Sequence, residues 1–103
     1  MSQPLVKNAA NEKQLKSAEH KEKFAREKEL NAWREILNLP SGRMVLWNLM
    51  GKCKVFGSVW DNSARIHFNA GQQDIGHFIM SEICEADEES FFQMMRENKK
   101  ENL

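Results

Sequence analysis

Nearly all of the large apolar residues that could build a core lie between Leu39 and Ile83 or directly beside this stretch. Residues 6–23 are mostly polar, and their few apolar positions form at most a narrow stripe. From Phe24 onward the pattern strengthens, and Leu30, Trp33 and Leu37 recur at the i, i+3, i+7 spacing of one helical face. The pattern predicts a long helix over residues 5–38 that docks only through its carboxy-terminal third.

This contrast divides the chain into an extended polar helical arm, residues 1–23, and a small helical domain, residues 24–103. Residues 7–38 lack Pro and Gly and are rich in good helix formers, and acid-first pairs at i,i+4 such as Glu22 with Arg26 add local support. The arm carries too little apolar surface for the domain to hold it. It either projects from the domain, packs on another chain or frays.

A second helix is expected after Pro40, which cannot lie within a helix and so ends the first one near Asn38. Ser41 is the expected cap, and the segment carries an apolar face made of Val45, Leu46, Leu49, Met50 and Cys53. Arg43 falls in the first turn, where the helix dipole disfavours a cation. Some group must compensate its charge: a carboxylate or a set of backbone carbonyls within the protein, or a bound phosphate.

Two shorter helices are expected after an irregular connection that starts beyond Gly51. Asp61 or Ser63 can cap the first of them, in which Gly71 and Gly76 indicate a bend or a close helix crossing. A helix start at Asp87 predicts the last one.

The connection itself should contribute to the core, through Val55, Phe56, Val59 and Trp60. No stretch alternates like a strand. The predicted fold is therefore all-α: a long amino-terminal helix followed by a compact group of about three shorter helices.

Charge and composition narrow the functional classes. Lys plus Arg and Asp plus Glu both total 15, so the net charge is zero, which weighs against a dedicated DNA-binding protein. Residues 82–103 are acidic, with seven carboxylates against three cations, which indicates self-association, the orientation of a partner, or a solvated tail. The two cysteines lack metal-ligand spacing and no apolar run could cross a bilayer, so we expect reduced thiols in a protein made in the cytoplasm.

No catalytic or metal-binding constellation is present in the sequence. His20, His67 and His77 are scattered, and His77 lies ~10.5 Å along a helix axis from Cys84, too far to activate a nucleophile. A helix-turn-helix fits poorly because the helix after Ser63 offers few base-reading or phosphate-binding side chains. The sequence predicts no enzyme, no metal and no cofactor.

The polar run from Asn69 to Asp74 interrupts an amphipathic helix and is either a solvated face or a partner contact. Gly71 would allow close approach of a partner backbone, and Gln72 or Gln73 could bridge donors and acceptors across an interface. Exposed aromatic and Met residues also favour protein interfaces. The candidate partner contacts are Arg43, Trp47, Asn69, Gln72 and Gln73.

The chain carries the pattern Gly-Arg-x-Val-Leu-Trp at residues 42–47, then Phe-Asn-x-Gly and Ile-Gly at residues 68–76, then Met-Met-x-Glu at residues 94–97. This pattern resembles a small domain family of tailed bacteriophages that is encoded among head and DNA-packaging genes, over about residues 35–97. One departure is Gln72-Gln73, where a basic residue commonly follows the glycine. The resemblance implies a phage origin and a helical domain.

These observations lead to two functional hypotheses. The first is a non-enzymatic virion or head-assembly protein that binds other phage structural proteins, such as the portal or internal ejection proteins. Such a protein would be made in the host cytoplasm, reside in the virion, and form a homo-oligomer or a multi-copy assembly. The alternative is a small nucleic-acid-binding packaging or regulatory factor, because the first helix carries Lys7, Lys13, Lys16, Lys21, Lys23 and Lys28.

Overall fold

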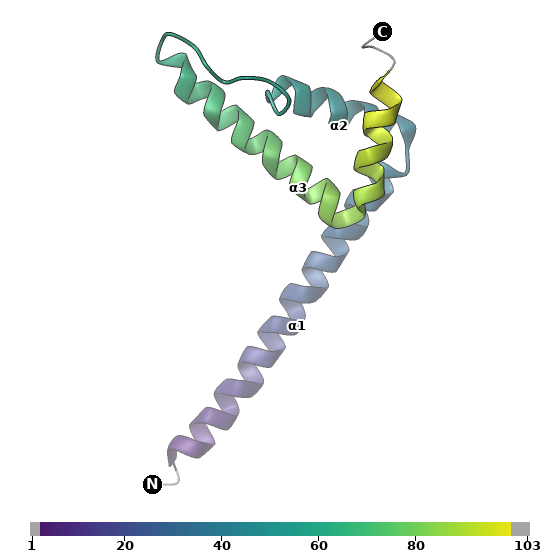
Figure 1. The fold of residues 1–103 in the computed structure, drawn as a ribbon. Helices are drawn as coiled ribbons and strands as arrows, with labels where there is room; N and C mark the ends of the chain where they lie inside the picture. Colours follow the sequence, from purple (N-terminus) through teal and green to yellow (C-terminus); the bar gives the residue numbers. More distant parts are fainter. Residues whose placement is uncertain (1–2, 100–103) are drawn as a thin grey trace.

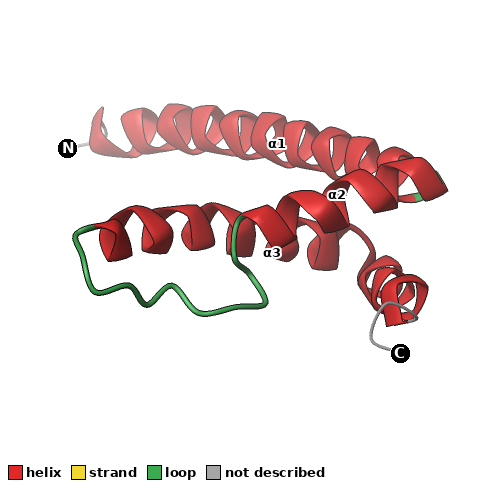
Figure 2. Cartoon of the chain, turned by 90° about the horizontal axis from the view of Figure 1, so that it is seen from above, coloured by secondary structure: helices red, strands yellow, loops and turns green. Residues whose placement is uncertain are grey.

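The computed structural model describes residues 3–99, with side chains from residue 9 onward, and contains three helices. They are α1 (Gln3–Leu37), α2 (Pro40–Lys52) and α3 (Arg65–Asn98) (Figures 1 and 2). Residues 3–99 contain no strand, so the predicted all-α class with a long first helix is confirmed. The Cα radius of gyration is 20.7 Å and the extents are 73 × 38 × 15 Å. A globular chain of this length would have a radius near ~13 Å.

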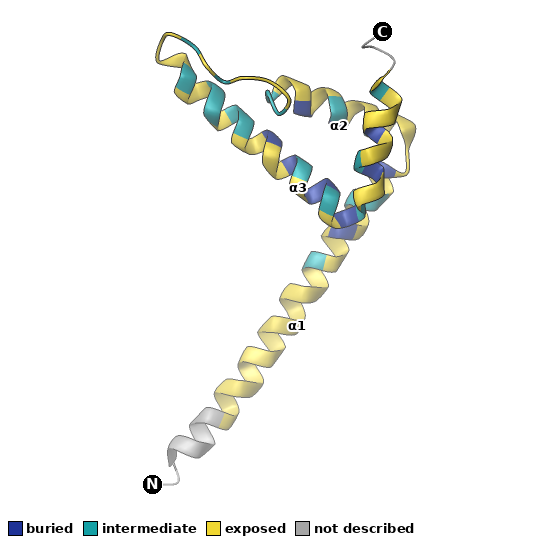
Figure 3. Ribbon diagram, in the orientation of Figure 1, coloured by how far each residue is buried: buried dark blue, intermediate teal, exposed yellow. Residues whose placement is uncertain are grey.

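The elongation arises because α1 docks through its carboxy-terminal part only. Residues 9–25 are all exposed, and Figure 3 shows this half of α1 pointing away from the other helices. Leu30 and Leu37 are buried and Trp33 packs against the core, as the apolar spacing predicts. Phe24, which the sequence placed at the start of the docking face, is 74% exposed. The division into residues 1–23 and 24–103 stays a prediction.

A tight turn joins α1 to α2. Leu39 has extended backbone angles (φ −94°, ψ 126°) and caps α2, whose first residue is Pro40. The predicted cap at Ser41 is wrong, because the helix already begins at Pro40, which disfavours helical geometry at the residue before it and is itself well suited to the first helical position. A Cβ on Gly42 would lie 2.2 Å from the carbonyl oxygen of Ile36. Only glycine fits this turn without a shift of the backbone.

α3 starts after an irregular connection over residues 53–64. The Ser63 hydroxyl accepts a hydrogen bond from the Arg65 N–H at 3.3 Å, and the Asp61 carboxylate accepts one from the Ser63 N–H at 3.0 Å. The helix passes Gly71 and Gly76 without a break, so the expected bend is wrong at both. At Gly76 the close approach is to the start of the connection rather than to a helix, because a Cβ would lie 2.7 Å from the Cβ of Cys53. At Gly71 no heavy atom would lie within 4 Å.

A bend at Asp87 divides α3 into a first arm, residues 65–86, and a second arm, residues 88–98. Asp87 has extended backbone angles (φ −165°, ψ 94°), and its carboxylate accepts a hydrogen bond from the Ser90 hydroxyl at 2.9 Å. This confirms the helix start predicted at Asp87, since a new helical arm begins there. The predicted third and fourth helices are consequently the two arms of a single element.

The core lies where α1, α2 and the two arms meet. Its buried apolar members are Leu30, Leu37, Leu46, Met50, Ile79, Ile83, Ala86 and Met94. Val55 packs against this core, but Phe56 and Trp60 are exposed, so the connection closes the core less than the sequence predicted. None of the helices described over residues 3–99 has the length and apolarity needed to cross a membrane.

Candidate functional site

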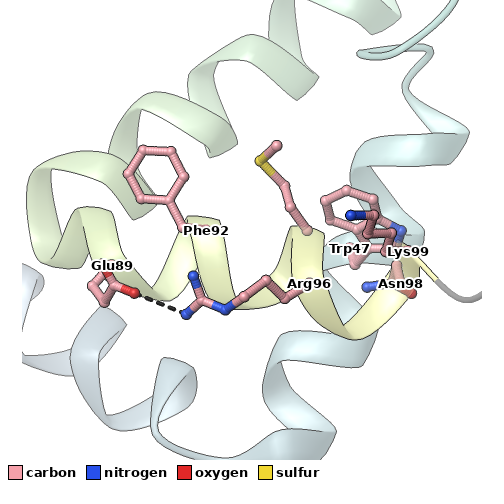
Figure 4. A pocket seen from close by; sticks show the side chains of 7 residues that line it. Trp47, Glu89, Phe92, Arg96, Asn98 and Lys99 are labelled. Atoms are coloured by element: carbon pink, nitrogen blue, oxygen red, sulfur yellow. Dashed lines mark hydrogen bonds and ion pairs between the residues drawn. The ribbon is translucent and has the colours of Figure 1, made fainter.

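A groove of about 540 Å³ lies between α2 and the second arm of α3. Trp47, Phe92 and Met95 give it an apolar lining, and Asn98 and Lys99 stand at its end beside the Trp47 ring (Figure 4). On its rim the Arg96 guanidinium lies 2.8 Å from the Glu89 carboxylate, and both side chains are more than half exposed. The groove combines an apolar surface with a charged border, which is the usual anatomy of a protein-binding surface.

Trp47 is held in the groove wall by an aromatic stack. Its ring lies 4.7 Å from that of Phe56, with 28° between the planes. The neighbouring residue Leu46 and the later Met50 face the core, so helical periodicity places Trp47 at the edge of that buried face, half exposed. Its exposed edge is fixed in place and available to a partner. Its role in binding stays a prediction.

Arg43, the second candidate contact, is bound inside the protein. Its Nε and Nη2 donate to the Glu97 carboxylate at 3.0 and 2.8 Å, and its Nη1 donates to the Leu37 carbonyl at 2.8 Å. Its side chain is only 13% exposed. The hydrogen bond from Arg43 holds the pKa of Glu97 below its usual value. Of the alternatives that the sequence left open, the structure contains a carboxylate together with one backbone carbonyl.

Asn69 and Gln73 also bind within the chain. The Asn69 amide donates to the Val59 carbonyl at 3.2 Å, and the Gln73 amide donates to the Lys54 and Gly57 carbonyls at 2.7 and 3.1 Å. They hold the connection over residues 53–64 against the first arm. Neither of the two interpretations offered for this polar run, a solvated face or a partner contact, describes these two amides.

The five candidate residues therefore do not form one site. Arg43 and Trp47 lie on α2 beside the second arm, whereas Asn69, half-buried Gln72 and Gln73 lie on the first arm beside the connection. Phe92 and Met95, which line the groove, were not among the candidates. The signal that could have found them is their i, i+3 spacing on the side of the last helix away from buried Met94.

The sequence also missed the main polar centre of the fold. The Arg26 guanidinium binds both carboxylate oxygens of buried Glu82, at 2.9 and 2.5 Å, and one oxygen each of Glu85 and Glu29, at 2.6 and 2.5 Å. These bonds hold the pKa of Glu82 below its usual value and raise that of Arg26. The expected local pair with Glu22 is absent among the described ion pairs.

Arg34 binds the backbone where α3 bends. Its Nε donates to the Ala86 carbonyl at 2.7 Å, directly before Asp87, where the helical bonding pattern is interrupted. Arg26 continues the Leu30, Trp33 and Leu37 face by one turn, at four residues before Leu30. That position is the signal by which the sequence could have shown Arg26 to be a docked residue.

The remaining reactive side chains do not converge. Cys53 and Cys84 are free thiols, and burial raises the pKa of the Cys84 thiol, which favours its protonated form. Within residues 3–99 no three His, Cys, Asp or Glu side chains gather closely enough to hold a metal ion. The predicted absence of enzymatic activity and of a cofactor stays a prediction.

In a comparison with known families, residues 33–96 match the family described as Bbp19-like phage protein. The matched range is close to the stretch, about residues 35–97, on which the motif resemblance rests. No curated protein and no solved structure matches the chain.

Proposed function

Because the chain belongs to the family of Bbp19-like phage proteins, we propose that it is a non-enzymatic component of the phage particle or of head assembly that binds other phage proteins. The supporting observation is the amount of exposed apolar surface. In the described part of the chain, fourteen large apolar side chains are exposed, against eight apolar residues in the core. Single exposed apolar residues need no explanation, but contiguous ones typically mark interaction surfaces.

The groove between α2 and the second arm is the proposed contact surface for the partner. Phe92 and Met95 are each more than two fifths exposed and lie beside the fixed Trp47 ring. An aromatic and Met lining can accept apolar side chains of a partner, and Glu89 and Arg96 on the rim can orient that partner through its charged groups. Proteins such as the portal or the internal ejection proteins are the proposed partners, and the virion is the proposed location.

The test measures how much of the protein is incorporated into phage particles. A phage encoding Phe92→Ser and Met95→Ser should assemble particles in which mass spectrometry finds at least ~10-fold less of this protein, provided the variant keeps its circular dichroism spectrum. Met44→Ser, at an exposed apolar residue of α2 that does not line the groove, is the control. If wild-type protein is absent from particles, or if the groove variant enters them like the control, the proposal is wrong.

A second candidate function, nucleic-acid binding, is favoured by one observation. Lys13, Lys16 and Lys23, with His20, recur at i, i+3, i+7 and i+10 on the exposed half of α1, and none is in an ion pair described for residues 9–99. Such a stripe could contact phosphates. Three glutamates in the same stretch, Glu12, Glu19 and Glu22, oppose this role.

Salt dependence separates the two candidates. Each phosphate contact contributes a slope of about −0.9 to the logarithm of affinity against the logarithm of salt concentration for duplex DNA. Three lysine contacts would therefore give a slope near about −3. A steep salt dependence of DNA affinity that disappears in the triple variant Lys13→Gln, Lys16→Gln, Lys23→Gln would favour nucleic-acid binding over the first proposal.

A further inference from the structure

The first arm of α3 carries an exposed apolar stripe that the groove does not include. Phe68, Ile75 and Phe78 are 64%, 59% and 57% exposed, and Gly71 is exposed between the first two. The four residues occur at i, i+3, i+7 and i+10, so they share one face of the helix. We refer to Phe68, Gly71, Ile75 and Phe78 as the α3 stripe.

The direction of the α3 stripe follows from its continuation. Glu82 is the next residue at the same spacing, and its carboxylate is bound by Arg26 of α1. The α3 stripe therefore faces the side of α3 on which α1 lies. Figure 1 shows that the two helices diverge from this contact, with the free half of α1 leading away from the first arm. Residues 9–25 of α1 are exposed and do not cover the stripe.

The spacing of the α3 stripe is symmetric. Reading from Phe68 to Phe78 or from Phe78 to Phe68 gives steps of three, four and three residues, with only Gly71 and Ile75 exchanged. We propose that a second copy of this chain covers the stripe, with the two first arms packed antiparallel about a two-fold axis. Each Phe68 then meets the partner copy's Phe78, and each Ile75 enters the open space above the partner copy's Gly71.

Charge at the two ends of the α3 stripe supports the same pairing. At one end a single cation, Arg26, binds three carboxylates, which leaves an excess of negative charge. At the other end Arg65 is exposed and lies in none of the ion pairs described for residues 9–99. Antiparallel packing places Arg65 of one copy opposite Ser81 of the other, which is one residue from Glu82 and about one helical turn from Glu85. Opposite charges therefore meet at both ends.

The area of the contact predicts a weak dimer. An aromatic side chain has roughly 150–250 Å² to bury, so the stripe offers on the order of 300 Å² of apolar surface per copy. Since about 60% of an interface is apolar, the total contact would be about 1,000 Å², at the lower limit of specific interfaces. The dimer should accordingly dissociate in roughly the micromolar range.

The inference goes beyond the proposed function, since it concerns another face and needs no other protein. Sedimentation equilibrium of the purified chain should show a monomer–dimer equilibrium. Gly71→Gln should raise the dissociation constant at least ~10-fold, because the added side chain fills the space that Ile75 of the partner copy would enter. Within the monomer this change meets open space and replaces glycine by a good helix former, so it should not unfold the chain.

Two controls make the result specific. Gly51→Gln, at another helical glycine with no heavy atom within 4 Å of its missing Cβ, should leave the dimer unchanged. Asp74→Asn should tighten the dimer by roughly twofold, because antiparallel packing brings the two exposed Asp74 side chains together beside the axis. A wild-type chain that stays monomeric, a dimer indifferent to Gly71→Gln, or weaker association of Asp74→Asn would each overturn the proposal. None of these outcomes bears on the groove, which particle incorporation tests.

Discussion

At the scale of single residues, the glycines show how position decides the effect of one methyl group. Gly42 and Gly76 lie where an added Cβ would overlap neighbouring atoms, at 2.2 Å from the Ile36 carbonyl oxygen and 2.3 Å from a Val55 methyl group. Gly51 and Gly71 face open space. The first pair is required by packing, whereas the second pair costs helix stability unless something outside the monomer uses the space.

The first prediction concerns Gly42. Gly42→Ala should lower the free energy of unfolding by about 1–3 kcal/mol, because the overlap with a backbone oxygen outweighs the gain in helix propensity. Gly51→Ala should instead raise it by up to ~1 kcal/mol. Urea unfolding of the two variants measures the difference. Equal shifts in the same direction would mean that the turn after Leu39 relaxes freely.

At the scale of elements, arginines join the helices across long stretches of sequence. Arg26 binds Glu82, Arg34 binds the Ala86 carbonyl, and Arg43 binds Glu97. The first two contacts join α1 to the part of α3 around the bend at Asp87, and the third joins α2 to the second arm. Among the residues whose side chains are described, eight apolar ones are buried in the core. The arginine contacts join the same helices and add to this small core.

The second prediction is a pH dependence. The pKa of Glu82 is lowered in the folded state, so its contribution to stability is present above the unfolded value, about 4.3, and is lost as the pH falls through the folded value. Glu82→Gln should lower the melting temperature near about pH 7 and lose part of the acid sensitivity towards about pH 3. If the difference in melting temperature between the variant and the wild type were the same at both pH values, the assignment would be contradicted. Glu85→Gln, at a more exposed carboxylate on the same guanidinium, is the control.

The third prediction separates the two halves of α1. Deletion of residues 1–20 should leave the melting temperature nearly unchanged, because residues 9–20 are exposed. Trp33→Ala should destabilise the fold by about 3 kcal/mol, the lower end of the range for a large aromatic residue, since Trp33 is only partly buried. Thermal unfolding distinguishes the halves. If the thermal transition were lost on truncation but kept in Trp33→Ala, α1 would dock through its amino-terminal half and the assignment made here would be wrong.

At the scale of the whole molecule, the apolar spacing predicted the all-α class and the docked third of α1, and a capping residue followed by acidic residues predicted the new helical arm at Asp87. It could not predict that Asn69 and Gln73 bind the connection, because a polar run looks the same whether its amides meet water, a partner or distant carbonyls. The cluster around Arg26 depends on residues 56 positions apart, a separation that local pairing rules do not reach. The groove and the α3 stripe likewise depend on which apolar residues the small core leaves uncovered.

The fourth prediction concerns overall shape. Small-angle scattering of the monomer at low concentration should give a radius of gyration close to the 20.7 Å of the Cα atoms, well above the ~13 Å of a globular chain of this length. Deletion of residues 1–20 should shorten the maximum dimension by about 30 Å, at ~1.5 Å per helical residue. A value near ~13 Å for the intact chain would mean that α1 folds back on the domain.

The long sequence separation of the arginine contacts also governs the order of events during translation. Arg26, Arg34 and Arg43 find their partners 56, 52 and 54 residues later, at Glu82, Ala86 and Glu97. The docking face of α1 therefore leaves the ribosome well before α3, against which it docks most extensively, has been synthesised. α2 is likewise made well before its partner Glu97. Nascent chains on one messenger RNA present incompletely covered helices to one another during that interval, which favours association between copies of this chain.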